Sequence, residues 1–126
     1  MTITMEPVKT GSKYDAPWNL QEAQALVAKI WEPLAQAGFH VGLTGSVLYK
    51  GSSDKDLDLI VYPHKTGEKT LNDAVRALKS LGFVRWFNYK AVRAARGQGD
   101  FEYGYDNKKV EIWRYNKKRV DIFFLS

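Results

Sequence analysis

The segment from Asp56 to Tyr62 restricts the fold of this chain more than any other. Its sequence, DLDLIVY, alternates aspartates with large aliphatic residues. Successive side chains of a β-strand point to opposite faces of the sheet. One face of this strand therefore carries Leu57, Leu59 and Val61, and the other carries Asp56, Asp58 and Ile60. This pattern predicts a strand with one face packed on a core and acidic groups on the other.

Two helices are predicted around this strand. The first begins at Asn19, a suitable N-cap with Glu22 three residues later, and Gly38 is its natural stop. Pro33 lacks a backbone donor and is expected to kink or split this helix near Glu32. The second helix is predicted over 70–81, with leucines on one stripe and Gly82 as its stop.

The remaining segments favour strands. Residues 39–44 alternate and lead directly into Gly45-Ser46, and residues 83–89 are predicted to form a third strand. Residues 91–99, with Arg93 and Arg96, are expected to form a mobile basic connection. Strand-like runs follow, separated by plausible hairpin turns at Asp106-Asn107 and Asn116-Lys117. The order of elements predicts an α/β (α+β) fold, with a mixed central sheet and helices packed mainly on one side.

Length and composition favour one intracellular domain. The chain has 126 residues, 44% of them hydrophobic, and no run of 18 apolar residues. We expect a flexible arm over 1–17, a single domain over 18–126 and a cytoplasmic location. The absence of cysteine excludes disulfides and thiolate metal sites. A net charge of +5 favours polyanionic partners such as nucleotides or nucleic acid, although a solvated basic surface gives the same value.

The segment from Gly42 to Val61 contains the candidate chemistry. Two strand residues that share a face lie about 7 Å apart, so Asp56 and Asp58 can converge on one or two divalent ions. Carboxylates suit magnesium or manganese. Gly45 permits a tight turn, and the Ser46 hydroxyl and nearby amides can donate to phosphate at the start of a helical turn. Lys50 and Lys55 lie inside the same loop and can contact phosphate, though each could also be solvated surface.

These residues resemble the DNA polymerase beta-like nucleotidyltransferase superfamily, whose signature is Gly-Ser followed by Asp-x-Asp on a strand. Nine residues separate Ser46 from Asp56 here. The resemblance implies that Gly45 and Ser46 bind the phosphates of a nucleoside triphosphate such as ATP, and Lys55 is a further candidate because it lies in the same loop. It also implies that Asp56, Asp58 and a third carboxylate bind Mg²⁺ or Mn²⁺. Asp121, in a hydrophobic context on a late strand, fits the third position, as metal ligand or as the group that activates the acceptor hydroxyl.

The activity implied is transfer of a nucleoside monophosphate to a hydroxyl of a protein, an RNA end or a small molecule, with release of pyrophosphate. Larger relatives have a further helical domain after the third carboxylate. Because the given sequence ends at Ser126, the resemblance implies a minimal member that uses a homodimer or a partner chain.

The same residues are compatible with other functions. The chain could be an inactive nucleotide- or RNA-binding module, possibly antitoxin-like, or could catalyse hydrolysis or phosphorolysis at the same site. Arg119 lies two residues before Asp121 and could simply pair with it. His40 and His64 have no recognisable ligand spacing. The four tryptophans at helix or strand periods, Trp18, Trp31, Trp86 and Trp113, are expected to lie mainly in the core.

Overall fold

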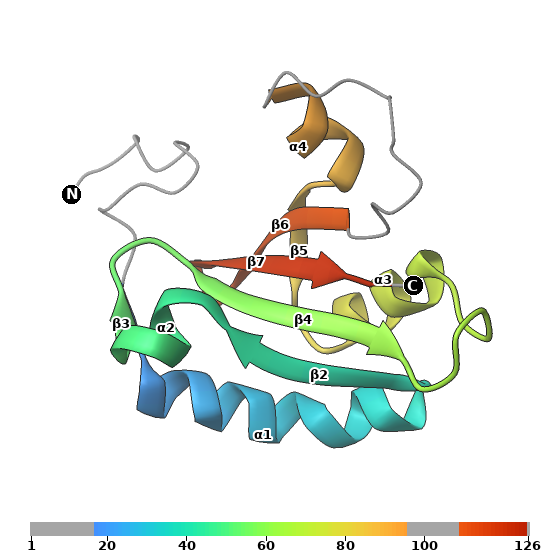
Figure 1. Ribbon diagram of the computed structural model, residues 1–126, viewed down its shortest axis with the longest axis horizontal. Helices are drawn as coiled ribbons and strands as arrows, with labels where there is room; N and C mark the ends of the chain where they lie inside the picture. The colour runs from blue at the N-terminus through green and yellow to red at the C-terminus, as the bar shows by residue number, and fades with distance from the viewer. Residues whose placement is uncertain (1–16, 96–108, 126) are drawn as a thin grey trace.

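A five-stranded mixed sheet forms the centre of the computed structural model, which describes residues 17–95 and 109–125. Its strands lie in the order β2-β4-β7-β6-β5 (Figure 1). β4 and β7 run parallel, and the other neighbouring pairs are antiparallel. The bounds are β2 Phe39–Thr44, β4 Leu57–Pro63, β5 Val84–Phe87, β6 Lys109–Tyr115 and β7 Lys118–Phe124. The predicted α+β class with a mixed central sheet is confirmed.

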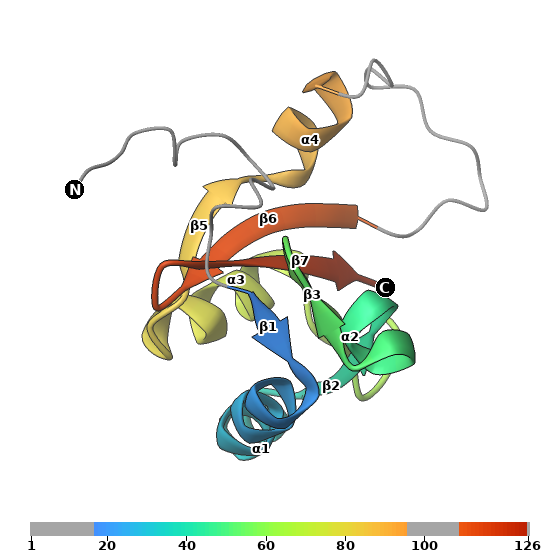
Figure 2. The same ribbon diagram turned by 90° about the vertical axis from the view of Figure 1, so that its left-hand side faces the viewer.

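Helices α1 (Leu20–Gln36) and α3 (Leu71–Ser80) pack on one face of this sheet (Figure 2). The aliphatic face of β4 is fully buried against them, as predicted, with Leu57, Leu59 and Val61 at most 1% exposed. Asp58 and Ile60 lie on the opposite face of β4. The core therefore lies on the helix side of the sheet, and the acidic face is directed away from it.

Helix α1 begins where the sequence predicts. The Asn19 side chain accepts a hydrogen bond from the Glu22 amide (2.7 Å), and Glu22 Oε1 accepts one from the Asn19 amide (3.1 Å). The expected split near Glu32 is wrong, because α1 is one helix to Gln36. Pro33 lies in the last turn, where its missing amide removes one intrahelical hydrogen bond. Its carbonyl still accepts from the Ala37 amide.

Helix α4 (Tyr89–Ala95) corrects two sequence-based expectations. Strand β5 ends at Phe87 rather than Tyr89, and the segment after Ala91 is helical rather than an irregular connection. The Asn88 side chain accepts from the Ala91 amide (2.8 Å), and the Asn88 carbonyl accepts from Val92 (3.0 Å). These bonds satisfy amides that a helix start leaves without partners.

The turn between β6 and β7 is the hairpin predicted at Asn116-Lys117. Both residues have positive φ, 51° and 67°, which suits a two-residue turn between antiparallel strands. The turn predicted at Asp106-Asn107 lies outside the described residues, as does the expected arm over 1–17 except for Pro17. Arg96 and the remainder of the predicted basic connection lie there as well.

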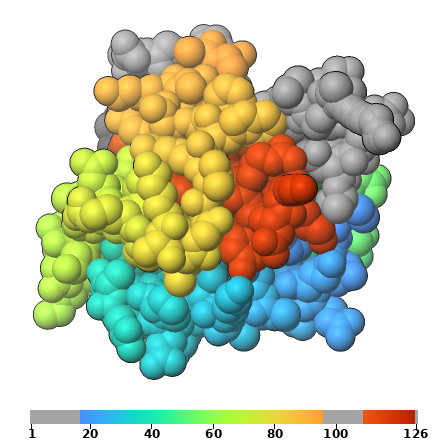
Figure 3. All heavy atoms as spheres, turned by 180° about the vertical axis from the view of Figure 1, so that it is seen from behind, coloured from blue at the N-terminus to red at the C-terminus, as the bar shows by residue number. Residues whose placement is uncertain are grey.

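The β6–β7 hairpin is linked to α1 by side chains. Lys29 Nζ donates to Tyr115 Oη (2.8 Å), and Lys118 Nζ donates to Glu22 Oε2 (2.9 Å). Seen from behind, the surface of α1, in blue to cyan, adjoins the red surface of the hairpin (Figure 3). These contacts fix the strand that carries Asp121 against the first helix.

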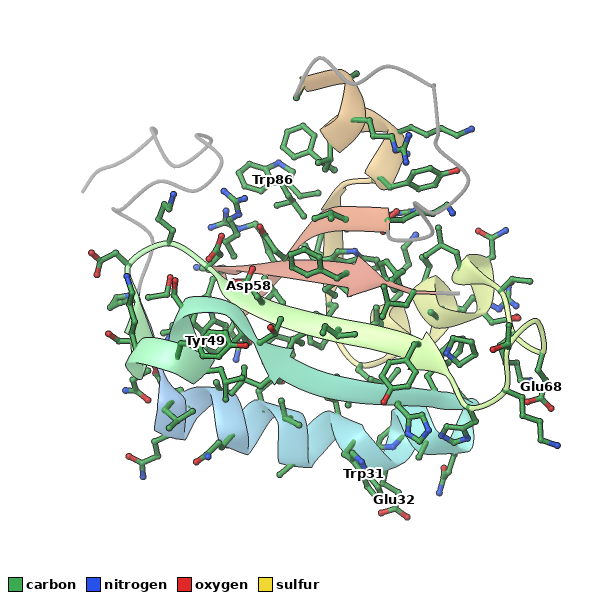
Figure 4. The ribbon with its side chains drawn as sticks, in the orientation of Figure 1. Trp31, Glu32, Tyr49, Asp58, Glu68 and Trp86 are labelled. Atoms are coloured by element: carbon green, nitrogen blue, oxygen red, sulfur yellow. The ribbon has the colours of Figure 1, made fainter. Side chains whose placement is uncertain are left out.

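The tryptophans divide between core and surface. Trp18 and Trp113 are buried, as expected, and Trp86 is half-buried. Trp31 is 55% exposed, which contradicts the core expectation, and Figure 4 shows it beside Glu32 at the outer side of α1. Trp31 follows the fully buried Ile30 by one residue, a rotation of about 100° away from the buried stripe. Across residues 17–95 and 109–125, no helix has the length and apolar character needed to cross a membrane.

Candidate metal centre

Three acidic side chains, two from β4 and β7 and one from the residue before β4, meet on the face of the sheet opposite α1 and α3. Asp58 and Asp121 are register partners on the parallel strands β4 and β7, so they project side by side. Asp56 immediately precedes β4. One carboxylate oxygen from each of the three residues lies within 4.8 Å of the others. The structure therefore brings together the three carboxylates that the sequence singled out.

This donor set fits a hard divalent ion. All three residues offer carboxylate oxygens, the ligand type that Mg²⁺ and Mn²⁺ prefer. Asp56 and Asp58 are half-buried and Asp121 is buried, so the oxygens lie together in a partly desolvated position. The arrangement could hold one divalent ion after small shifts of the side chains.

Position 45 requires glycine because the Asp58 side chain lies against it. Gly45 opens the short helix α2 (Gly45–Lys50) directly after β2, with a φ of +75°. A Cβ at this position would lie 2.0 Å from Asp58 Oδ2 and 2.8 Å from Asp58 Cβ. No side chain fits there without moving the aspartate. The left-handed conformation also disfavours any residue other than glycine.

Ser46 and Lys55 line a hollow of about 420 Å³, together with Lys50, Ser52, Ser53 and Asp54. Figure 4 shows Asp58 and Tyr49 of α2 at the same end of the sheet. Hydroxyl and ammonium groups are donors, so the hollow has the chemistry to accept an anionic group. None of the three candidate metal ligands lines this hollow. Lys55 directly precedes Asp56 in the chain, and Ser46 follows Gly45, which lies against Asp58.

The loop before Asp56 is held by contacts that sequence reasoning missed. Ser53 Oγ accepts hydrogen bonds from the Lys55 and Asp56 amides, both 3.2 Å. The short strands β1 (Trp18–Asn19) and β3 (Ser52–Ser53) pair with each other, which links this loop to the start of α1. The Ser52-Ser53-Asp54 sequence is a signal for such a turn, since a serine hydroxyl in a turn often accepts hydrogen bonds from amides two or three residues ahead.

Arg119 pairs with Asp121, as the sequence allowed. Its Nε donates to Asp121 Oδ1 (2.7 Å) and its Nη2 donates to Oδ2 (3.0 Å). Nη2 also lies 3.9 Å from Asp56 Oδ2. The arginine therefore belongs to the acidic cluster and supplies its nearest positive charge among the described residues.

Burial and the crowding of carboxylates raise the pKa of Asp58 to about 7. Burial is the largest cause, and repulsion from Asp56 and Asp121 adds to it, while Arg119 and Lys55 oppose it. Burial and Asp121 also raise the pKa of Asp56. Such a shift means that, without a bound cation, the folded protein favours a protonated Asp58 at pH values where an exposed aspartate is ionised.

This shift predicts how the stability of the metal-free protein depends on pH. The folded pKa of Asp58, about 7, exceeds its ordinary value of 3.8, so the folded state holds a proton that the unfolded state has lost between these values. The stabilising contribution is complete below about pH 4 and is lost as the pH rises through about 7. We expect the thermal midpoint in EDTA to fall between pH 5 and 8 more steeply in the wild type than in Asp58→Asn. Parallel slopes for the two proteins would contradict the assignment.

Comparison with known proteins finds solved structures with a similar fold but no similar sequence. No protein-family model and no curated protein match the sequence. Among solved structures, a cytoplasmic RNA terminal U-transferase superposes with a TM-score of 0.56 at 16% identity. The match covers 83% of this chain and 28% of that one. Cid1, described as having RNA terminal uridylyl transferase activity, superposes with a TM-score of 0.53 at 16% identity and covers 83% and 31%.

This chain thus spans less than a third of the length of either solved structure. Both neighbours are described as RNA terminal uridylyl transferases, and at 16% identity the likeness concerns the fold. The shared features are the mixed sheet and the helices packed against it. The described part of the chain therefore has the nucleotidyltransferase-like fold of these two solved structures.

Proposed function

We propose that this protein is a metal-dependent nucleotidyltransferase that moves a nucleoside monophosphate from a nucleoside triphosphate to an acceptor hydroxyl and releases pyrophosphate. The observation that supports it most directly is the meeting of Asp56, Asp58 and Asp121 beside Gly45. The fold of the structural neighbours is the second support.

Each side chain has a role in this proposal. Asp56, Asp58 and Asp121 hold Mg²⁺ or Mn²⁺, which when bound would stabilise the negative charge on the transferred phosphate and on the pyrophosphate. Ser46 and Lys55 donate to the triphosphate in the hollow that they line. Gly45 leaves room for the Asp58 carboxylate. The chain thereby orients the triphosphate against the acidic face, and positioning supplies much of the rate.

An RNA 3′-hydroxyl is the first acceptor to test. Both structural neighbours act on RNA termini, and the net charge of +5 favours a polyanionic acceptor. A protein or a small-molecule hydroxyl is the next class, which makes a cell extract a useful second source of acceptors.

The test is a labelling assay with [α-³²P]ATP, CTP, GTP and UTP supplied separately. Each reaction contains Mg²⁺ or Mn²⁺ and either a short single-stranded RNA or a cell extract. We expect one acceptor to be labelled by the wild type and the labelling to fall by about 10³-fold in Asp58→Asn, because a metal ligand is removed while the side-chain shape is kept. Product analysis distinguishes transfer from hydrolysis or phosphorolysis.

A matched control is Glu68→Gln, which also removes one negative charge but lies on an exposed loop far from Asp58 (Figure 4). This variant should label at the wild-type level. Labelling that persists undiminished in Asp58→Asn would rule out the proposed function.

One observation favours a second candidate, an inactive nucleotide- or RNA-binding module. Arg119 already occupies both oxygens of the third carboxylate, as a structural ion pair would. The same reactions separate the two functions. No labelling with any triphosphate, together with RNA binding that weakens as salt rises, would support the module.

A further inference from the structure

The Arg119 side chain lies within the acidic cluster, in contact with Asp121 and close to Asp56. It lies two residues before Asp121 on β7 and projects from the same face. Leu57 pairs with Val120 and Asp58 with Asp121, so this parallel register places Arg119 alongside Asp56. The side chain is 11% exposed and that of Asp121 is 7% exposed. The pair is therefore largely shielded from water.

One contact holds the backbone at Arg119, and a second arginine lies beside it on the next strand. The indole of Trp18, itself 4% exposed, donates from Nε1 to the Arg119 carbonyl (2.9 Å) and holds the strand at this residue. Arg114 is the register partner of Arg119 on β6. Its guanidinium donates to the Lys117 carbonyl (2.7 Å) and lies 4.7 Å from the Trp86 ring.

The geometry of the pair matters because a guanidinium and a divalent ion compete for the same acceptor. Both Asp121 oxygens accept hydrogen bonds from the planar fork of Arg119. A metal ion coordinated by all three carboxylates would lie close to that fork, where two positive charges repel strongly in a partly desolvated position. Each Asp121 oxygen keeps a second lone pair, so the opposition between the ion and the arginine comes from the repulsion of their charges at this carboxylate.

We propose that the Arg119 guanidinium acts as the resident cation of this centre and that a divalent ion binds all three carboxylates only by displacing it from Asp121. This inference rests on the proposed function, because it concerns the same metal ligands. The exchange of cations at Asp121 itself breaks no covalent bond. Its consequence is that Arg119 weakens the affinity for the metal while it neutralises part of the acidic cluster before the ion arrives.

The test is Mn²⁺ binding without nucleotide, measured by electron paramagnetic resonance on the folded protein. Arg119→Met removes the charge and keeps an unbranched side chain, so we expect it to bind Mn²⁺ at least about tenfold more tightly than the wild type. Arg119→Lys keeps a charge without the fork and should fall between them. Arg114→Met removes a charge from the neighbouring position on the same face and should stay within about threefold of the wild type.

A measurement on the unmodified protein covers the case in which Arg119→Met fails to fold. The Nε–H signal of Arg119, followed by ¹H–¹⁵N NMR, should shift on addition of Mg²⁺ because its hydrogen bond to Asp121 breaks. An unchanged Arg119 signal at saturating Mg²⁺, or equal Mn²⁺ affinity in the wild type and Arg119→Met, would overturn the inference and leave the proposed function intact. Absence of Mn²⁺ binding in every variant would overturn both.

Discussion

Replacing Gly45 by alanine is expected to reduce Mn²⁺ affinity by about 10- to 100-fold and to reduce the proposed nucleotidyl transfer by a similar factor. The added methyl group would lie 2.0 Å from Asp58 Oδ2, 2.7 Å from Cγ and 2.8 Å from Cβ. Rotation about the Cα–Cβ bond can move the oxygen away, but the Asp58 Cβ is fixed to the backbone of β4. The clash therefore has to be relieved by shifting the strand or turning the carboxylate out of the cluster.

The control for this variant is Gly51→Ala. Gly51 also has a positive φ, +86°, but a methyl group added there would meet no atom within 4 Å. Both substitutions should destabilise the fold by about 1 to 2 kcal/mol through the left-handed backbone, and Gly45→Ala alone should lose metal binding. Calorimetric titration with Mn²⁺ together with thermal melting separates the two effects. Normal Mn²⁺ affinity in folded Gly45→Ala would show that Asp58 is not a ligand in its present position.

Replacing Glu111 by alanine is expected to lower the free energy of unfolding by about 3 kcal/mol or more, the usual effect of removing one partner from a buried ion pair. Glu111 is 0% exposed. It accepts from Arg85 with both oxygens, from the Trp113 indole (3.0 Å) and from the Tyr89 amide (3.0 Å). The variant leaves these donors without their acceptor, and they come from β5, β6 and the start of α4. Urea denaturation followed by circular dichroism gives the change.

Two further variants make this measurement specific. Glu111→Gln keeps the shape and one acceptor oxygen, so its loss of stability should be smaller than that of Glu111→Ala. Glu32→Ala removes an exposed glutamate from α1 and should change the free energy of unfolding by less than about 0.5 kcal/mol. A change as small in Glu111→Ala would mean that Arg85 and the other donors find new partners at little free-energy cost.

The elements predicted correctly are those whose signals are local. The Asn19 and Glu22 capping pair, the Thr70 start of α3 and the Asn116-Lys117 turn each depend on residues within four positions of one another. Such signals survive in any tertiary context because they satisfy nearby backbone groups. The sequence does not predict helix α4, although Asn88 is a suitable N-cap. The aromatic residues Trp86, Phe87 and Tyr89 around it are equally compatible with a strand that continues.

The candidate site depends on contacts that local patterns do not contain. Asp58 and Asp121 are 63 positions apart (121 − 58), and they meet because β4 and β7 pair in parallel. The family resemblance indicates Asp121 as a partner, whereas the alternation of residues alone can place it only on one face of a strand. The buried Glu111 and the link from Trp18 to Arg119 have no sequence pattern that would indicate them.

The position of β7 in the sheet has a consequence for synthesis of the protein on the ribosome. β7 is the last strand along the described chain, yet it lies between β4 and β6 in the sheet. Until it has emerged, β2-β4 and β5-β6 are two separate strand pairs without their common neighbour. The chain is therefore expected to fold late and in one cooperative step, since its non-local pairing must wait for the final strand.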